Sequence, residues 1–222
     1  MVYAYLSDRR QRVGLKGVYS ALKSVSSGVP QGSILGPLLF QLYINDLLDF
    51  VSLNTLMELF ADDSKMHRVI KSLADCLTLQ NDIEAVANWC TLWCMTLNVI
   101  KCQFISFNRN INPIIFHYNI DGTVLAKVNE IRDLGVVVGD DLTFSSHINN
   151  IVKKANQTWA TVRFVFDKKV NPRVMQPLFN SLVRSKLEYN TVSWDHITKA
   201  NLSKIERVQR RATRHMIGSN FD

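Results

Sequence analysis

The sequence predicts an α+β fold, in which an antiparallel sheet with packed helices is followed by an all-helical segment. As far as residue 144, short strand-like stretches alternate with turn residues and with two stretches of helical length. From Ser145 onward, apolar residues recur only at helical spacing. Because the pattern changes once, we expect an α+β unit over residues 1–144 and a helical unit over residues 145–222.

The N-terminal part predicts the end of a helix, two extended stretches and then a second helix. Residues 11–15 have strand composition, and Lys16-Gly17 indicates a turn into the next extended stretch. A helix is expected to begin at Gly36-Pro37, since proline suits the first turn of a helix. Residues 38–51 are apolar on nearly every side of that helix, so we expect it to be buried.

A β-hairpin is predicted next, with strands over residues 56–60 and 65–70. Ala61-Asp62-Asp63 between them predicts a tight turn. Apolar residues at helical spacing then predict a helix over residues 75–97. The remaining strands expected in this unit cover residues 103–107, residues 114–118, the segment through Val124 after the Asp121-Gly122 turn, and residues 134–138.

The C-terminal unit predicts three helices. An apolar stripe runs from Ile148 to Phe166, a second helix starts at Pro172 and covers residues 174–189, and a third carries apolar positions from Leu202 to Met216. Basic residues on this unit are candidates for binding a polyanion. They are Lys153, Lys154, Arg207, Arg210, Arg211 and Arg214.

Charge is distributed unevenly along the 222 residues, whose net charge is +7. Residues 1–144 hold 12 basic and 14 acidic side chains, whereas residues 145–222 hold 14 basic and 5 acidic ones. A basic second unit predicts a polyanionic partner, with nucleic acid preferred over a membrane surface. The alternative is a solvated basic helical face without a partner. No apolar run is long enough to span a bilayer, so no transmembrane helix is expected. The predicted partner is nucleic acid and not a membrane.

The four cysteines include no Cys-x-x-Cys pair, which predicts a reducing, intracellular location, either nuclear or cytoplasmic. Cys90, Cys94, Cys102 and His117 are conceivable zinc ligands. Their spacing fits no common zinc finger, so we favour buried free thiols.

Asp62 and Asp63 form the first candidate site, because two adjacent carboxylates repel each other unless a cation or a basic partner is close. Carboxylate oxygens are ligands that Mg²⁺ prefers. An ordinary aspartate-rich turn explains the same pair, since aspartate is common in turns. The dipeptide by itself leaves both interpretations open.

Two motifs together resemble reverse transcriptases of non-long-terminal-repeat retrotransposons, in particular jockey-like elements. SGVPQGSILGPLLF (residues 27–40) is similar to the segment beside template and incoming nucleotide, and FADD (residues 60–63) is similar to the metal-binding hairpin. They stand in the family's order. Flanking segments that also resemble the family are YLSDRRQRV, LNVIKCQFISF, IRDLGVVVGDDLTFSSHI (a primer-grip hairpin), LVRSKLEYNTVSW and IERVQRRATRHMIG.

The resemblance implies a partial polymerase palm over residues 1–144 and a basic thumb over residues 145–222. Mg²⁺ or Mn²⁺ would be bound by Asp62 and Asp63, and Lys101 would assist departure of pyrophosphate or be a solvated lysine. Gln31 and Gly32, with Pro30, match positions that contact template and nucleotide. Turn geometry and helix capping are the preferred explanation for Gly28, Pro30 and Gly36. The implied partners are an RNA template with a DNA primer, and a deoxynucleoside triphosphate.

One departure from the family pattern concerns a further catalytic aspartate, which the family carries on a strand well upstream of the Gly-Pro-Gln-Gly segment. Before Gly28, Asp8 is the one carboxylate, and it matches a position downstream of that strand. The family's triphosphate-binding fingers region is not matched either. We therefore expect residues 1–222 to be catalytically incomplete. Two alternatives are a nucleic-acid-binding module that grips a template–primer duplex, and an interaction protein in which FADD is only a turn.

Overall fold

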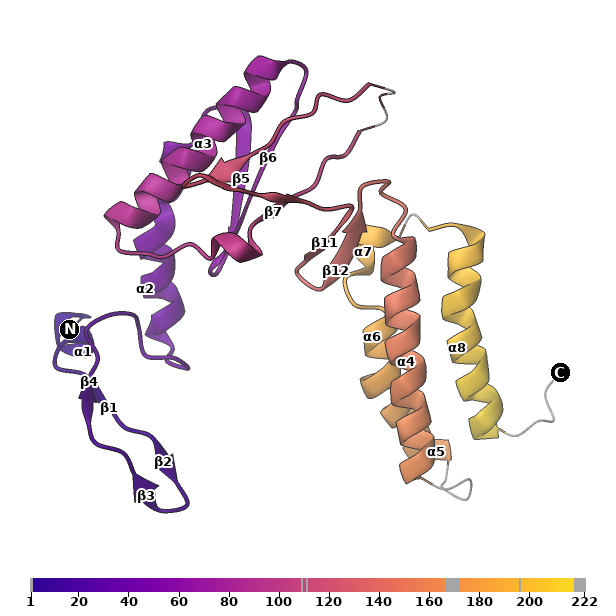
Figure 1. The fold of residues 1–222 in the computed structure, drawn as a ribbon. Coiled ribbons are helices and arrows are strands. Elements are labelled where there is room, and N and C mark those ends of the chain that lie inside the picture. The colour runs from indigo at the N-terminus through magenta and orange to yellow at the C-terminus, as the bar shows by residue number, and fades with distance from the viewer. Residues whose placement is uncertain (1, 109, 111, 167–171, 196, 218–222) are drawn as a thin grey trace. The chain divides into compact units, whose positions relative to one another are not determined.

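The computed structural model describes residues 2–108, 110, 112–166, 172–195 and 197–217. The chain forms two compact units. Unit 1 comprises Met1–Val99 and Ile114–Leu125, and unit 2 comprises Ile100–Pro113 and Ala126–Asp222 (Figure 1). The predicted boundary near residue 144 stays a prediction.

Unit 1 begins with helix α1 (Val2–Leu6) and a narrow β-hairpin. Its strands are β1 (Arg10–Gln11), β2 (Gly14–Leu15), β3 (Val18–Tyr19) and β4 (Lys23–Ser24). Strand β1 pairs with β4 and β2 with β3, both antiparallel. The turn at Lys16-Gly17 is confirmed, since both residues have positive φ, 49° and 83°.

In the remainder of unit 1, helices α2 and α3 and the short helix η1 pack on one face of a β-hairpin. In chain order the elements are α2 (Leu35–Ile44), the 3₁₀ helix η1 (Asn45–Phe50), β5 (Thr55–Phe60), β6 (Asp63–Arg68), α3 (Leu73–Leu92), β8 (Asn119–Ile120) and β9 (Thr123–Val124). Figure 1 shows α3 lying alongside β5 and β6. The core joins the two helical segments to the hairpin, and its buried members are Ile44, Leu47, Val86, Trp89 and Cys90.

The expectation that the helix after Gly36-Pro37 is buried on nearly every side is wrong for this chain. Leu38 and Leu42 on α2 are 53% and 67% exposed, because α3 and the hairpin cover only one side of the helix. Helix α3 confirms the predicted long helix but ends five residues early. Cys94 there adopts φ 56°, and the Met95 amide donates to the Cys90 carbonyl at 2.8 Å, which closes the helix end.

The 3₁₀ turn η2 (Val99–Lys101) leads from unit 1 into unit 2, which then contains two strand pairings. These strands are β7 (Gln103–Phe104), β10 (Ala126–Lys127), β11 (Glu130–Asp133) and β12 (Val136–Gly139). Strands β7 and β10 pair in parallel, whereas β11 and β12 form an antiparallel hairpin. Within the described residues every strand has a single partner, so one continuous antiparallel sheet is not formed.

Three strand predictions require correction. The strand predicted over residues 103–107 ends at Phe104. Residues 114–118 contain no strand, and pairing begins only at Asn119, next to the confirmed turn at Asp121-Gly122. Leu134 and Gly135, predicted as the start of a strand, form the turn between β11 and β12, with φ 43° and 92°. The β11–β12 hairpin overlaps the segment that resembles a primer grip, and that role stays a prediction.

From Ser145 onward, the described residues of unit 2 are mainly helical, as predicted. Its helices are α4 (Ser145–Val165), α5 (Pro172–Phe179), the π-helical η3 (Asn180–Arg184), α6 (Ser185–Leu187), α7 (Thr191–Trp194) and α8 (Lys199–Ile217). The predicted continuous helix over residues 174–189 is interrupted by the π turn, which follows Pro177, a residue without a backbone N–H to donate.

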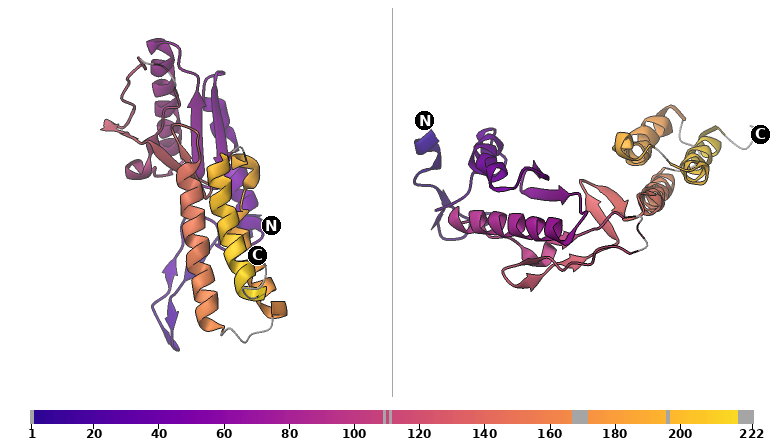
Figure 2. Two further views of the ribbon diagram at one scale, coloured as in Figure 1. Left: turned by 90° about the vertical axis from the view of Figure 1, so that its right-hand side faces the viewer. Right: turned by 90° about the horizontal axis from the view of Figure 1, so that it is seen from above.

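Helices α4 and α8 lie side by side and run in the same direction (Figure 2). Three hydrogen bonds join them: Asn201 to Ser145, Lys204 to Asn149 and Arg211 to Asn156, at 3.2, 2.8 and 2.9 Å. The two residues of each pair are 55 or 56 positions apart in the sequence, as expected for two parallel helices. The core between the helices includes Trp159, Phe179, Val183, Val208 and Ala212.

Candidate functional site

Asp62 and Asp63 lie at the end of the β5–β6 hairpin, as predicted. Phe60 pairs with Asp63, so Ala61 and Asp62 form a two-residue turn and Asp63 is the first residue of β6. Ala61 adopts φ 52°, which an alanine tolerates only with strain and which a tight hairpin connection needs. The two aspartates therefore occupy different positions, one in the turn and one in the strand.

The hairpin has one packed face and one exposed face. Met57, Leu59 and Met66 pack against the core of unit 1. On the opposite face, Asp63 shares its side of the hairpin with Phe60, which is 63% exposed. The neighbouring pair on that face is Glu58 and Lys65, whose charged groups are 2.9 Å apart. Asp63 thus points to the open side of the hairpin.

Both carboxylates are exposed and, within the described residues, neither forms a hydrogen bond or an ion pair. Asp141 is an aspartate with a structural role in a turn of this chain, and it serves as a comparison. Its carboxylate accepts from the Thr143 amide at 3.0 Å and from the Thr143 hydroxyl, which lowers the pKa of Asp141. Asp62 and Asp63 lack such capping, so their oxygen atoms are open to a ligand.

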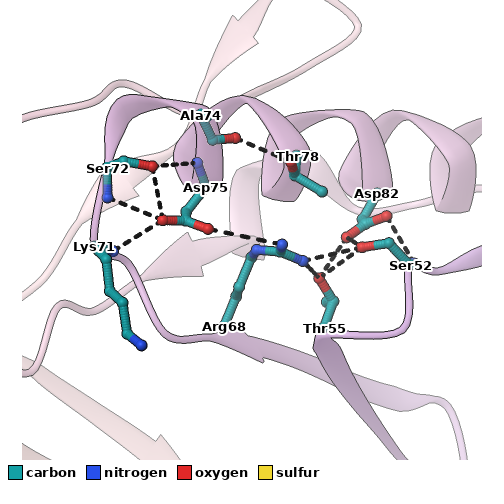
Figure 3. A network of polar contacts seen from close by, with 9 residues as sticks. All are labelled: Ser52, Thr55, Arg68, Lys71, Ser72, Ala74, Asp75, Thr78 and Asp82. Carbon is teal, nitrogen blue, oxygen red and sulfur yellow. Dashed lines mark hydrogen bonds and ion pairs between the residues drawn. The ribbon is translucent and has the colours of Figure 1, made fainter.

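A network of hydrogen bonds joins the other end of the hairpin to α3 (Figure 3). Asp82 is 6% exposed and accepts from the Ser52 amide, the Ser52 hydroxyl and the Thr55 hydroxyl, at 2.9, 2.8 and 2.5 Å. Arg68 donates to the same two hydroxyls, each at 3.0 Å. Since Thr55 begins β5 and Arg68 ends β6, the network fixes the base of both strands.

Asp75 extends this network to the start of α3. Its carboxylate accepts from the Ser72 hydroxyl and from the amides of Lys71 and Ser72, and lies 3.8 Å from the Arg68 guanidinium. These hydrogen bonds, that from the Ser72 side chain above all, lower the pKa of Asp75. The capping box with Ser72 starts the helix at a fixed place beside the hairpin.

Sequence pattern alone does not predict the network formed by Ser52, Thr55, Arg68 and Asp82. One signal was present: Asp82 lies beside Ile83, among the apolar positions of α3, where a carboxylate is costly unless it is bonded. The partners, however, come from a loop and two strands, so only the folded chain shows them.

The Gln31-Gly32 turn lies in the loop before α2. Gln31 is exposed and Gly32 has φ 79°, while Pro30 is half-buried. The Ser33 hydroxyl donates to the Pro30 carbonyl at 2.7 Å and accepts from the Gly36 amide at 3.1 Å. A Cβ at Gly36 would lie 2.8 Å from the Ser33 hydroxyl oxygen. This geometry accounts for Pro30 and Gly36 as turn and helix-start residues and leaves Gln31 free to contact a ligand.

The predicted nucleic-acid contacts are exposed side chains of unit 2. Lys153 projects from α4 on the side away from its buried stripe, Lys154 lies at the edge of that stripe, and the four arginines project from α8. Arg210 pairs with Glu206 at 2.7 Å and Arg211 is bonded to Asn156, whereas Arg207 and Arg214 have no partner within the described residues. Lys101 is also exposed, at the end of η2.

No three His, Cys, Asp or Glu side chains gather into a metal-binding group in the part of the chain that the structure describes. Of the cysteines considered as zinc ligands, Cys90 is buried, Cys102 is half-buried and Cys94 is exposed, so the expectation of buried thiols is wrong for Cys94. Among the described helices, none is long and apolar enough to cross a membrane.

Comparisons with known proteins agree with the motifs. The family profile "Reverse transcriptase (RNA-dependent DNA polymerase)" matches residues 5–138. The chain is 27% identical over 234 residues to an RNA-directed DNA polymerase from mobile element jockey of Drosophila melanogaster, covering 99% of this chain and 25% of the relative. A probable RNA-directed DNA polymerase from transposon BS of the same organism is 26% identical over 221 residues, 95% of this chain and 24% of the relative.

A probable RNA-directed DNA polymerase from transposon X-element, also of Drosophila melanogaster, is 25% identical over 231 residues and covers 100% of this chain and 25% of the relative. The chain thus spans about a quarter of the length of the curated relatives it matches. No solved structure matches it significantly.

Proposed function

Since the chain belongs to the reverse transcriptase (RNA-dependent DNA polymerase) family, we propose that it is part of the RNA-directed DNA polymerase of a jockey-like, non-long-terminal-repeat retrotransposon. The reaction is nucleotidyl transfer. A primer 3′-hydroxyl attacks the α-phosphorus of a deoxynucleoside triphosphate opposite an RNA template, and pyrophosphate leaves. The observation that supports this most is the position of Asp62 and Asp63, uncapped and exposed at the hairpin end inside the matched region.

Asp62 and Asp63 are suited to Mg²⁺ or Mn²⁺, because they offer hard oxygen atoms that no described protein group occupies. Two carboxylates together with substrate phosphates are a usual ligand set for Mg²⁺. When bound, the metal would neutralise charge on the attacking and leaving oxygens. We assign no third carboxylate from residues 1–222.

The proposed contributions of the other residues are placement and charge. The Asp82–Arg68 network holds the base of the hairpin, so that its aspartate-bearing end keeps one orientation relative to α3. Gln31 and Gly32 contact template and nucleotide, and Lys101 screens the leaving pyrophosphate. In this proposal residues 1–144 are palm, residues 145–222 are thumb, and the basic side chains of α4 and α8 bind the duplex. The setting is intracellular, nuclear or cytoplasmic.

We further propose that residues 1–222 alone bind a template–primer duplex without extending it. Members of a bridging carboxylate set act as a unit, and Asp62 with Asp63 form only part of such a set. A non-catalytic nucleic-acid-binding module is the second candidate function, which the exposed arginines of α8 favour.

Primer extension on an RNA template with Mg²⁺ or Mn²⁺ tests the proposal. It compares residues 1–222 with the product of the longest open reading frame that contains them, each with and without Asp62→Ala. We expect extension by the longer product only, and its loss with Asp62→Ala. Residues 1–222 should bind the duplex equally well with either residue.

Asp49→Ala, at an exposed position of η1, is the matched control and should leave extension by the longer product unchanged. Extension that persists with Asp62→Ala would contradict the polymerase assignment of this site. Residues 1–222 that fail to bind duplex at low salt would contradict the proposed role of the basic helices.

A further inference from the structure

The hairpin of residues 9–24, here called the basic hairpin, is a strongly cationic part of unit 1. It carries Arg9, Arg10, Arg12, Lys16 and Lys23 and contains no acidic residue. All but Arg9 are exposed, and within the described residues no carboxylate pairs with any of the five. A group of like charges without counterions attracts a polyanion.

The same hairpin carries a solvent-exposed aromatic ring. Tyr19 is 59% exposed and lies directly opposite Gly14 in the β2–β3 pair. The ring covers the glycine, since a Cβ at Gly14 would lie only 2.8 Å from Tyr19 Cε1. The guanidinium carbon of Arg12 lies 4.0 Å from the centroid of the ring. Gly14 and Arg12 therefore fix the orientation of Tyr19.

Beside Tyr19 the hairpin end forms an open, mainly apolar hollow that also includes Lys16. Its lining residues are Val13, Leu15, Lys16, Val18, Tyr19 and Ser20. By the strand register, the side chains of Leu15 and Val18 lie on the opposite face of the hairpin from the Tyr19 ring, so the hollow adds apolar surface and Lys16 next to that ring. A base inside a duplex is already stacked, so the exposed Tyr19 ring suits an unpaired base.

The base of the hairpin is tied to the loop that leads to Gln31. The Arg9 guanidinium donates to the carbonyls of Ser27 and Gly28, at 3.1 and 2.7 Å, and to the Leu6 carbonyl at 3.0 Å. The Val25 amide in turn donates to the Arg9 carbonyl at 2.8 Å. Nucleic acid on the hairpin would therefore continue toward the Gln31-Gly32 turn.

We propose that the basic hairpin binds the single-stranded part of the template, with phosphates on Arg10, Lys16 and Lys23 and an unpaired base against Tyr19. The inference rests on the proposed function, since it assumes that the Gln31-Gly32 turn receives a template. It adds to that function a binding surface outside the Gln31-Gly32 turn and the basic helices.

The test measures binding of residues 1–222 to a labelled single-stranded RNA of about 20 nucleotides, enough for more than one binding register. A blunt RNA–DNA duplex of equal length is the second probe. Two hairpin variants are compared, Arg10→Gln with Lys16→Gln, and Tyr19→Leu. Lys71→Gln with Lys127→Gln removes the same charge at exposed positions outside the hairpin and is the control.

We expect the double hairpin variant to lower the slope of log affinity against log salt for single strands by about 1.4, because each phosphate that is no longer neutralised accounts for about 0.7. Tyr19→Leu should weaken single-strand binding about five- to tenfold, since the variant has no ring for a base to stack on. Duplex binding should be unchanged by Tyr19→Leu, and the control variant should bind single strands as the parent does.

The inference would be overturned if either hairpin variant bound single strands as tightly as the parent chain, or if the control variant lost as much affinity as the hairpin variants. The proposed function would remain intact in both cases, provided that the parent chain binds duplex. A parent chain that binds neither probe would overturn both. Circular dichroism of each variant checks that the fold is retained.

Discussion

The hydroxyl of Tyr189 donates a hydrogen bond to the backbone carbonyl of Leu134 at 3.0 Å. Leu134 and Gly135 form the turn of the β11–β12 hairpin, while Tyr189 follows α6 more than fifty residues later. The Tyr189 carbonyl accepts from the Trp194 indole at 3.0 Å, which positions the tyrosine. The tip of this hairpin is thus bonded to the helical part of unit 2.

A second contact holds the same hairpin near α4. The Val137 amide donates to His147 Nδ1 at 3.2 Å, and the imidazole packs against the Trp194 ring with centroids 5.4 Å apart. The buried Val136 beside it belongs to the helical core. Hydrogen bonds at its turn and along β12 thus join the β11–β12 hairpin to the helices of unit 2.

Gly135→Ala should destabilise the chain by about 1–2 kcal/mol, because φ 92° strains an L-residue and the new Cβ would lie 3.1 Å from the Tyr189 ring. Gly122→Ala is the control, since Gly122 also has positive φ, 77°, but no atom within 4 Å of the added Cβ. Urea unfolding measures both. Equal destabilisation would mean that backbone strain alone matters and that the Tyr189 ring contributes nothing.

His147 predicts a pH dependence of stability. Burial, and secondarily the charge of Lys154, lower the pKa of His147 in the folded chain. Between the unfolded value near 6.5 and the lower folded value, the unfolded state binds more protons, so the free energy of unfolding falls as pH drops below about 6.5. Denaturant unfolding between pH 7.5 and 5.5 should show this decrease.

The His147→Gln variant should be less stable at pH 7.5 but should lose less stability on acidification than the parent chain. His67→Gln, at an exposed position of β6, is its control. A parent chain whose stability does not change between these pH values would show that His147 is not held neutral by the fold.

Asp82→Ala should lower the free energy of unfolding by about 3 kcal/mol, because the Ser52 amide and the hydroxyls of Ser52 and Thr55 would lose a buried acceptor. Asp49→Ala, at an exposed position, should change it by less than about 0.5 kcal/mol. Hydrogen exchange of β5 and β6 amides should rise in the first variant. If only global stability fell while those amides stayed protected, the network would not be what anchors the hairpin.

Arg207→Gln with Arg214→Gln should weaken duplex binding and lower its salt slope by about 1.8, because each duplex phosphate that is no longer neutralised accounts for about 0.9. These two arginines have no described protein partner, so replacing them leaves the packing of α8 intact. Arg210→Ala with Arg211→Ala should also weaken binding, but removes the bonds to Glu206 and Asn156 as well. Unchanged affinity of both variants at low salt would contradict the thumb assignment.

Most helices and strands of both units are predicted from the sequence because residues within a few positions of one another determine them. The FADD hairpin follows from strand-forming residues on both sides of a turn sequence, and α3, α4 and α8 follow from apolar residues at helical spacing. The turns at Lys16-Gly17 and Asp121-Gly122 are set by backbone conformations that glycine adopts readily.

The predictions from sequence are wrong where contacts between distant segments determine the local structure. Whether α2 is buried depends on how much of it α3 and the hairpin cover, and apolar composition alone cannot give that. The turn at Leu134-Gly135 is stabilised by Tyr189, which lies far along the chain. Strand pairing over residues 103–127 likewise depends on partners that local pattern does not specify.

By itself, the sequence determined the positions of Asp62, Asp63, Gln31 and the basic residues on particular elements, since periodicity and turn chemistry act within a few residues. Only the tertiary structure decided that Asp62 and Asp63 are uncapped, that Asp82 and Arg68 fix the hairpin base, and that Tyr19 lies open beside cations. The physical reason is that hydrogen bonding and burial of a side chain depend on neighbours brought together by packing, which local spacing does not encode.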